Sequence, residues 1–223
     1  MSTQRSATVT VVDSWECAVR EVLDALQPPA DPDVDPFRLP LLVAPSRAHG
    51  RAIAQQLALR DGIAAGIGGV TPARLRTDLE SLLLGLHTAD DPWRGAALAL
   101  RIAGVLDDVD QPWALPVRQH LTALVTSGVP SPAWDLARRT AADLETVAGQ
   151  WPQILTSWAR GEDVDAAGRP LDPAHAWWAP LWRRLLDQDH DVPDPARRRD
   201  LLADALADPS TVLPWSRCAW LTG

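Results

Sequence analysis

The chain has 223 residues, of which 46% are hydrophobic and 22% charged, and its formal net charge at pH 7 is −8. This composition predicts a soluble globular protein, and the acidic charge argues against a surface that coats nucleic acid along its whole extent. The longest apolar run, near residues 82–86, is too short to cross a bilayer, and the N-terminus lacks the continuous apolar stretch of a signal peptide.

Three strand–helix pairs are predicted in the first 90 residues. Alternating β-branched residues or short apolar runs indicate the strands, and apolar residues at helical spacing indicate the helices. Asp13 and Ser14 are placed to cap the first helix, Gly62 to end the second and Pro72 to open the third. The predicted strands cover residues 7–12, 39–44 and 63–70, and the predicted helices cover residues 15–26, 48–60 and 73–86.

From residue 92 the sequence changes to helical patterning without a strand pattern. Five segments begin with proline and carry apolar residues at helical spacing. They cover residues 92–106, 116–126, 132–158, 173–186 and 195–207. Residues 211–221 then predict a return strand. Because the chain stops two residues later, we expect it to be part of a longer protein.

This order of elements predicts an α/β fold with a parallel sheet and right-handed crossovers. We expect the first part of an α/β subdomain at residues 1–90, an all-helical insertion at 91–208 and a return strand to the sheet at 209–223. A helical block inserted between strands of such a sheet is the plan of domain 1 in superfamily-1 helicases, with its subdomains 1A and 1B.

A strand–turn–helix unit at Pro45 and Ser46 is of the kind that binds phosphate in nucleotide-driven motors. Yet the chain contains no G-x-x-x-x-G-K-[ST] motif, and all 21 of its basic residues are arginine. A P-loop needs its lysine to reach the β- and γ-phosphates and its hydroxyl to hold Mg²⁺. A P-loop would follow the first predicted strand, at residues 12–17, and there the chain has the carboxylates of Asp13 and Glu16. We therefore predict a motor-like fold without a nucleotide-binding site.

The remaining motifs predict no catalytic residue, no metal site and no cofactor. The histidines show no ligand spacing, and no G-x-S-x-G motif occurs. Acidic clusters at residues 90–91 and 107–110 lie at helix boundaries, where we interpret them as caps and dipole partners. Cys17 and Cys218 are far apart in the sequence, and we interpret them as two reduced, buried thiols of a cytoplasmic protein.

Tryptophans and one arginine run are interpreted as structural. Tryptophans can stack on bases, but those of the predicted helices fall at positions expected to pack in the core. They are Trp134, Trp151, Trp158, Trp177, Trp178 and Trp182. The run Arg197 to Arg199 predicts a solvated helix face balanced by nearby aspartates, and phosphate binding is the alternative. Those aspartates are Asp194, Asp200 and Asp204.

Several segments, taken in order, resemble one known family. They are residues Leu42 to Ser46, Gly62 to Ile67, Thr71 to Ala73, Ala141 to Leu144, Trp151 to Glu162 and Ala176 to Arg183. The series resembles the N-terminal, helicase-like region of the RecC-type gamma subunit of exodeoxyribonuclease V. The chain departs from that family at Thr146 and Val147, which stand where the family has acidic and glutamine residues after its A-A-D-L segment.

The resemblance implies a helicase-like fold without ATPase activity. It implies a non-catalytic DNA-handling and scaffolding subunit of a RecBCD-type ATP-dependent helicase–nuclease in double-strand-break repair and homologous recombination. The implied partners are RecB-like helicase–nuclease and RecD-like helicase subunits, with single-stranded DNA in the assembled complex. The implied role extends to reading a Chi-like signal. The alternatives are a stand-alone α/β pseudo-enzyme or protein-binding module with a helical cap, or an α/β hydrolase.

Four residues are predicted DNA contacts. Arg47 and Arg51 lie near the start of a predicted helix, where exposed amides and the macrodipole favour phosphate. Their alternative is a pair of solvated charges on a helix face. The resemblance links Asp143 and Leu144 to signal reading. Their alternatives are a surface acid and a core leucine.

Overall fold

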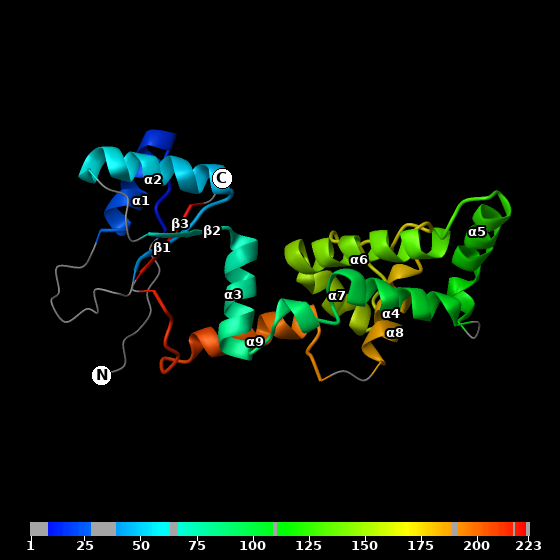
Figure 1. The fold of residues 1–223 in the computed structure, drawn as a ribbon. Helices are drawn as coiled ribbons and strands as arrows, with labels where there is room; N and C mark the ends of the chain where they lie inside the picture. The colour runs from blue at the N-terminus through cyan, green and yellow to red at the C-terminus, as the bar shows by residue number, and fades with distance from the viewer. Residues whose placement is uncertain are drawn as a thin grey trace. The chain divides into compact units, whose positions relative to one another are not determined.

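The computed structural model describes residues 9–27, 39–62, 67–108, 111–188, 191–215 and 217–221 (Figure 1). The chain separates into two compact units. The sheet unit comprises the described residues up to Leu79 and those from Asp204 on, and the helical unit comprises Glu80 to Ala203. The domain boundaries predicted from the sequence, after residues 90 and 208, stay a prediction.

A small parallel sheet organises the sheet unit and confirms the predicted α/β class. Its strands are β1 (Leu41–Val43), β2 (Gly68–Val70) and β3 (Cys218–Trp220), in the order β2-β1-β3. Both neighbours run parallel to β1, with Leu42 opposite Gly69 on one side and Ala219 on the other. The last strand of the chain therefore pairs with the second predicted strand, as a return strand should.

Local sequence signals set the helices of this unit, which are α1 (Trp15–Ala25), α2 (Arg47–Asp61) and α3 (Pro72–Leu84). The Ser14 side chain accepts a hydrogen bond from the Cys17 amide at the start of α1. Gly62 ends α2 with φ +81°, a left-handed conformation that favours glycine. Apolar residues of α1 and α2 form one core with Leu42 and Ala219.

The first predicted strand is wrong for the residues that the structure describes. Residues 9–12 have no regular structure and pair with none of the described strands, whereas residues 7 and 8 lie outside the described ranges. Val9 and Val11 are 86% and 92% exposed. Alternation stabilises a strand only where a neighbour supplies the ladder and one face is buried, and here neither condition holds. The start of the third predicted strand, at residues 63–66, also lies outside the described residues.

The helical unit contains the predicted proline-led helices, with shifted boundaries for all except α9. They are α4 (Gly95–Asp107), α5 (Leu115–Thr126), α6 (Pro132–Gln150), α7 (Pro152–Ala159), α8 (Trp178–Leu186) and α9 (Pro195–Ala207), with 3₁₀ turns η1 (Thr88–Asp90) and η2 (Pro112–Ala114). The predicted helix over 132–158 is two helices. Pro152 offers no amide and disfavours helical geometry at Trp151, which has φ −137° and ψ 57°.

The core of the helical unit lies mainly among α4, α6, α7 and α8. Ile102, Leu144 and Leu181 are each at most 1% exposed, and burial of such a side chain contributes about 1.5–3 kcal/mol. Trp182 is also buried, and its indole N–H donates to the Leu155 carbonyl at 3.1 Å. Burying an indole in this way requires the hydrogen bond, because an unpaired N–H in the core would be costly.

Two burial predictions need correction. Trp158 and Trp182 are core residues as predicted, but Trp134 and Trp151 are 37% and 42% exposed. These two lie at the ends of α6, where fewer neighbours cover a side chain. Of the two thiols, both free, Cys17 is half-buried and Cys218 is exposed on the outer strand β3. Among the described residues, no helix has the length and apolar character to cross a membrane.

Candidate nucleic-acid interface

The start of α2 is built by a serine that follows β1 directly. Ser46 is extended, with φ −147°, and its hydroxyl oxygen accepts from the His49 amide at 3.3 Å. The same oxygen lies 2.8 Å from the His49 Nδ1 atom, and the His49 ring meets Trp15 edge-on with centroids 5.6 Å apart. The turn at Pro45 and Ser46, which resembles a phosphate-binding unit in sequence, is therefore a helix cap, and Trp15 of α1 packs against it.

Arg47 and Arg51 lie on the first two turns of α2, and both are exposed. Neither forms a hydrogen bond or ion pair with another residue that the structure describes. The first turn also contains no acidic residue. Two positive charges four residues apart, at the positive end of a helix dipole, repel each other and leave the site favourable for an anion.

Asp143 and Leu144 lie in the middle of α6, with opposite exposures. Asp143 is exposed, whereas Leu144 is 1% exposed and belongs to the helical core. In this structure the Leu144 side chain is not accessible to a base, which agrees with its alternative interpretation as a core leucine. The arginine pair belongs to the sheet unit and this acidic position to the helical unit. The DNA contacts of all four residues stay predictions.

A pocket of about 520 Å³ in the helical unit was not predicted from the sequence. Its lining comprises Gln111, Trp113, Ala159, Pro180, Arg183, Arg184, Leu186 and Asp187. An aromatic ring beside two guanidinium groups is a combination that suits a base and a phosphate. Two adjacent arginines can be seen in the sequence, but it could not show that a tryptophan 70 positions before Arg183 lies at the same pocket.

Neighbouring groups orient the polar side chains of this pocket. The indole N–H of Trp113 donates to Gln111 Oε1 at 2.9 Å. One nitrogen of Arg183 donates to the Asp163 carboxylate at 2.7 Å and to the Trp158 carbonyl at 2.9 Å. Arg184 lies 3.5 Å from Asp108. The two short contacts orient the Arg183 guanidinium, and the nearby carboxylates neutralise part of the charge that an anion would meet.

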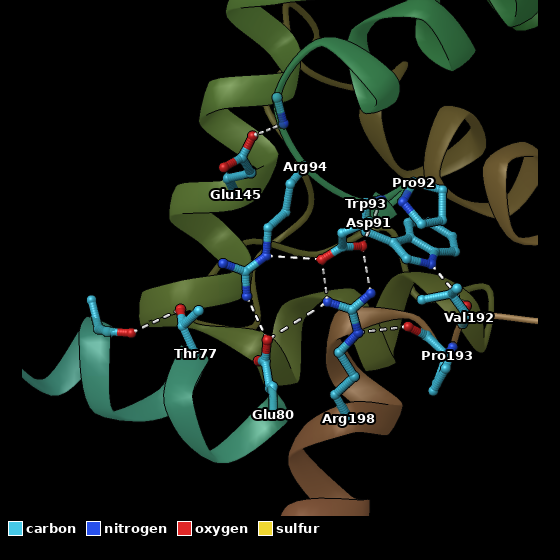
Figure 2. Close-up of polar contacts among 12 residues, drawn as sticks. Thr77, Glu80, Asp91, Pro92, Trp93, Arg94, Glu145, Val192, Pro193 and Arg198 are labelled. Atoms are coloured by element: carbon cyan, nitrogen blue, oxygen red, sulfur yellow. Dashed lines mark hydrogen bonds and ion pairs between the residues drawn. The ribbon is translucent and has the colours of Figure 1, made fainter. Parts of the chain in front are cut away.

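A buried ion cluster lies elsewhere in the helical unit and corrects the interpretation of the arginine run. Arg198 is 1% exposed, so it is not part of a solvated face. Its two terminal nitrogens donate to the two oxygens of Asp91, each at 2.6 Å, and its Nε donates to the Pro193 carbonyl (Figure 2). The partner is 107 positions away, which is why charge patterning along the helix did not find it.

Two further residues complete this ion cluster, which we define as Glu80, Asp91, Arg94 and Arg198. Arg94 Nε lies 2.9 Å from Asp91, and Arg94 Nη2 donates to Glu80. Arg198 Nη1 also lies 3.7 Å from Glu80. Burial raises the pKa of Asp91, but hydrogen bonds from Arg198 and from the Trp93 amide, with the charges of both arginines, outweigh it and hold that pKa below its ordinary value.

Arg101 is a second arginine held inside the helical unit. Its guanidinium carbon lies 4.2 Å from the centre of the Trp93 ring, and it donates to the Leu185 carbonyl at 2.6 Å and to Gln188 Oε1 at 2.9 Å. Burial lowers the pKa of Arg101 to about 10, so the group stays charged at neutral pH. Its partners are neutral acceptors and a ring face, which identifies Arg101 as a packing residue and not as part of the pocket.

The comparisons with known proteins give one consistent result. The family described as RecC, N-terminal domain, matches residues 13–214. The chain belongs to the RecC family. The resemblance found in the sequence is thereby confirmed, and the match spans both units of this RecC-family chain.

Two curated RecC proteins are similar in sequence to this RecC-family chain. It is 32% identical, over 199 residues, to the RecBCD enzyme subunit RecC of Mycobacterium tuberculosis strain H37Rv, a match that covers 83% of the chain. It is 29% identical, over 170 residues, to the RecBCD enzyme subunit RecC of Mycolicibacterium smegmatis, a match that covers 74% of the chain. The matched regions span 17% and 14% of these two relatives, so the chain corresponds to a small part of their length.

Proposed function

We propose that this chain is a DNA-handling and scaffolding part of a RecBCD-type helicase–nuclease in the bacterial cytoplasm. In this proposal, RecB-like and RecD-like partner subunits supply ATP hydrolysis and strand cleavage during double-strand-break repair. The observation that carries it is the match to the RecC N-terminal domain over residues 13–214. The missing P-loop motif and the absence of lysine support a non-catalytic role independently, because they leave no means of holding a nucleoside triphosphate.

The fold is compatible with the superfamily-1 domain 1A plan in this proposal. The parallel order β2-β1-β3 joins the last strand of the chain to the second predicted strand, and the helical unit lies between them in the sequence. We interpret the helical unit as the 1B-like insertion. A three-stranded sheet is a small platform, and the proposal assigns it to positioning the start of α2.

The proposed contact in the sheet unit is between α2 and the phosphates of a single strand. Arg47 and Arg51 are exposed, have no acidic neighbour in the first turn, and lie where the helix dipole already favours an anion. Contacts of this kind position a nucleic acid without reading its sequence. The proposal therefore assigns the arginine pair to guidance and not to signal recognition.

The proposed contacts in the helical unit are with bases. Trp113 supplies an aromatic face at the pocket, and stacking on such a face contributes about 1–3 kcal/mol per base. Arg183 and Arg184 supply guanidinium groups for the adjoining phosphate. Asp143 is exposed on α6 and is the remaining candidate for reading a Chi-like signal, through a hydrogen bond from a base amino group.

A salt-dependence experiment tests the guidance role. The chain is co-expressed with the RecB-like and RecD-like subunits, and single-strand affinity of the assembly is measured against salt concentration for Arg47→Ala/Arg51→Ala. Each lost phosphate contact should lower the slope of log K against log salt by about 0.7 for a single strand, so the double variant should lose about 1.4. Arg20→Ala, an exposed arginine on α1, is the matched control.

The outcomes separate the proposal from its alternatives. An unchanged slope in the double variant would reject the assigned contact. Failure of the chain to co-purify with either partner subunit would favour a stand-alone binding module. For the pocket, Trp113→Ala should weaken single-strand binding about tenfold or more, whereas Trp134→Ala, which removes an exposed tryptophan of α6, should not.

A further inference from the structure

The ion cluster joins three segments that are far apart in the sequence. Glu80 comes from α3, Asp91 and Arg94 from the segment before α4, and Arg198 from α9 (Figure 2). The side chains of Glu80, Asp91 and Arg198 are 8%, 4% and 2% exposed. At this burial, dissolved salt screens the charges far less than it would screen exposed pairs.

Hydrogen bonds that involve backbone groups surround the ion cluster. Asp91 Oδ1 accepts from the Trp93 amide at 3.0 Å, and the Trp93 indole donates to the Val192 carbonyl at 3.0 Å. Arg198 donates to the Pro193 carbonyl at 2.8 Å. The Trp93–Val192 hydrogen bond therefore links the segment that leads into α9 to the segment that leads into α4, beside the Arg198–Asp91 pair.

The buried leucines of α3 and α9 lie outside the core cluster of the helical unit. They are Leu75, Leu79 and Leu202. Among the described residues, the core of the helical unit includes Ala196 from α9 and no residue of α3. These two helices are also where the chain passes between the two units, between Leu79 and Glu80 in α3 and between Ala203 and Asp204 in α9. Within the helical unit, the ion cluster contacts the last turn of α3 through Glu80 and the start of α9 through Arg198.

We propose that the ion cluster is a clamp that fastens the last turn of α3 and the first turns of α9 to the core of the helical unit, and that its loss releases both segments while that core stays folded. The bidentate Arg198–Asp91 pair fixes orientation as well as distance, which an apolar contact of similar size does not. Removing one partner leaves a buried charge unpaired, so the clamped form becomes much less favourable than a locally open one. This inference does not depend on the proposed DNA contacts.

Hydrogen exchange of the full chain, followed by mass spectrometry, tests the clamp in the variant Asp91→Asn. Exchange of amides in the first turns of α9 and the last turn of α3 should accelerate by roughly two to three orders of magnitude. Amides of α4 and α6 should keep their protection. Arg199→Ala, which removes the neighbouring exposed pair with Asp200, is the matched control and should change neither region.

A milder variant keeps the test decisive if Asp91→Asn does not fold. Arg198→Lys retains the positive charge but loses the bidentate fork, and it should accelerate exchange in α9 about tenfold. The clamp is refuted if α3 and α9 exchange at the wild-type rate in the variant that folds. It is also refuted if α4 and α6 lose protection to the same extent, because the cluster would then belong to one cooperative core.

Discussion

Glu145 closes the N-terminus of a helix to which it does not belong. Its carboxylate, on α6, accepts a hydrogen bond from the Gly95 amide of α4 at 2.7 Å (Figure 2). The residue before Gly95 is Arg94, which provides no side-chain cap of its own. Gly95 has φ +52°, a left-handed conformation in which a side chain would be strained. Glu145 thus replaces the missing cap and places a negative charge at the positive end of the α4 dipole.

Glu145→Ala should destabilise the helical unit by about 1 kcal/mol, since it removes a helix cap. Glu145→Gln should cost less, because the amide oxygen still accepts the hydrogen bond and only the charge is lost. Urea denaturation followed by far-UV circular dichroism measures both. Asp143→Ala, which removes an exposed carboxylate from the same helix, is the control. An equal loss of stability from Asp143→Ala would mean that this acid has a structural role instead of a free surface position.

Leu144→Ala should destabilise the helical unit by about 2–5 kcal/mol, because it leaves a cavity in a well-packed core. Thermal unfolding of the variant measures the loss. At a temperature where the variant is folded, single-strand affinity should equal that of the wild type. A selective loss of DNA binding without a loss of stability would instead support the base contact that the family resemblance implies.

Arg101→Met should cost about 1–3 kcal/mol, although methionine fills a similar volume. The substitution removes the cation–π contact with Trp93 and leaves the Leu185 carbonyl without its side-chain donor. Chemical denaturation at pH 7 gives the difference in the free energy of unfolding. Arg138→Met on α6, where the arginine is exposed, should change stability by less than about 0.5 kcal/mol. Similar losses at both positions would show that Arg101 contributes no more than an ordinary surface residue.

The stability that Asp91 provides should vanish in acid and be constant at neutral pH. The pKa of Asp91 is lower in the folded protein than in the unfolded chain, so its contribution is fully present above the unfolded value and is lost as pH falls through the folded one. The stability difference between wild type and Asp91→Asn should therefore be steady from about pH 5 to 8 and shrink below about pH 4. Asp200→Asn, in an exposed pair, is the control. A difference that changes between pH 5 and 8 would contradict this assignment.

Local rules in the sequence were sufficient for most helices. Helix α9 has the bounds that were predicted, because Pro195 suits a first turn and the apolar spacing continues to Ala207. Ser14 and Gly62 perform the capping roles that their residue types predict. Each of these signals involves residues within one helical turn of each other, so no knowledge of the fold was needed.

The family could also be found in the sequence, because its motifs occur in order along one chain. The predicted strand at residues 7–12 failed where it is described, since a strand exists only if a partner lies beside it. The break at Trp151 and Pro152 was missed for a different reason. Proline ends a helix through a local effect, but the apolar periodicity continues across it and predicts one long helix.

The amino-acid sequence by itself determined which segments are helical, that it contains no P-loop motif, and which family the segments resemble. Tertiary structure alone decided that Arg198 is buried on Asp91, that Trp113 shares a pocket with Arg183, and that Glu145 caps α4. The physical reason is range. Helix propensity and capping by a neighbouring residue act over one turn, whereas the Glu145 cap and the Arg198–Asp91 pair join groups 50 and 107 positions apart, which only the folded core brings together.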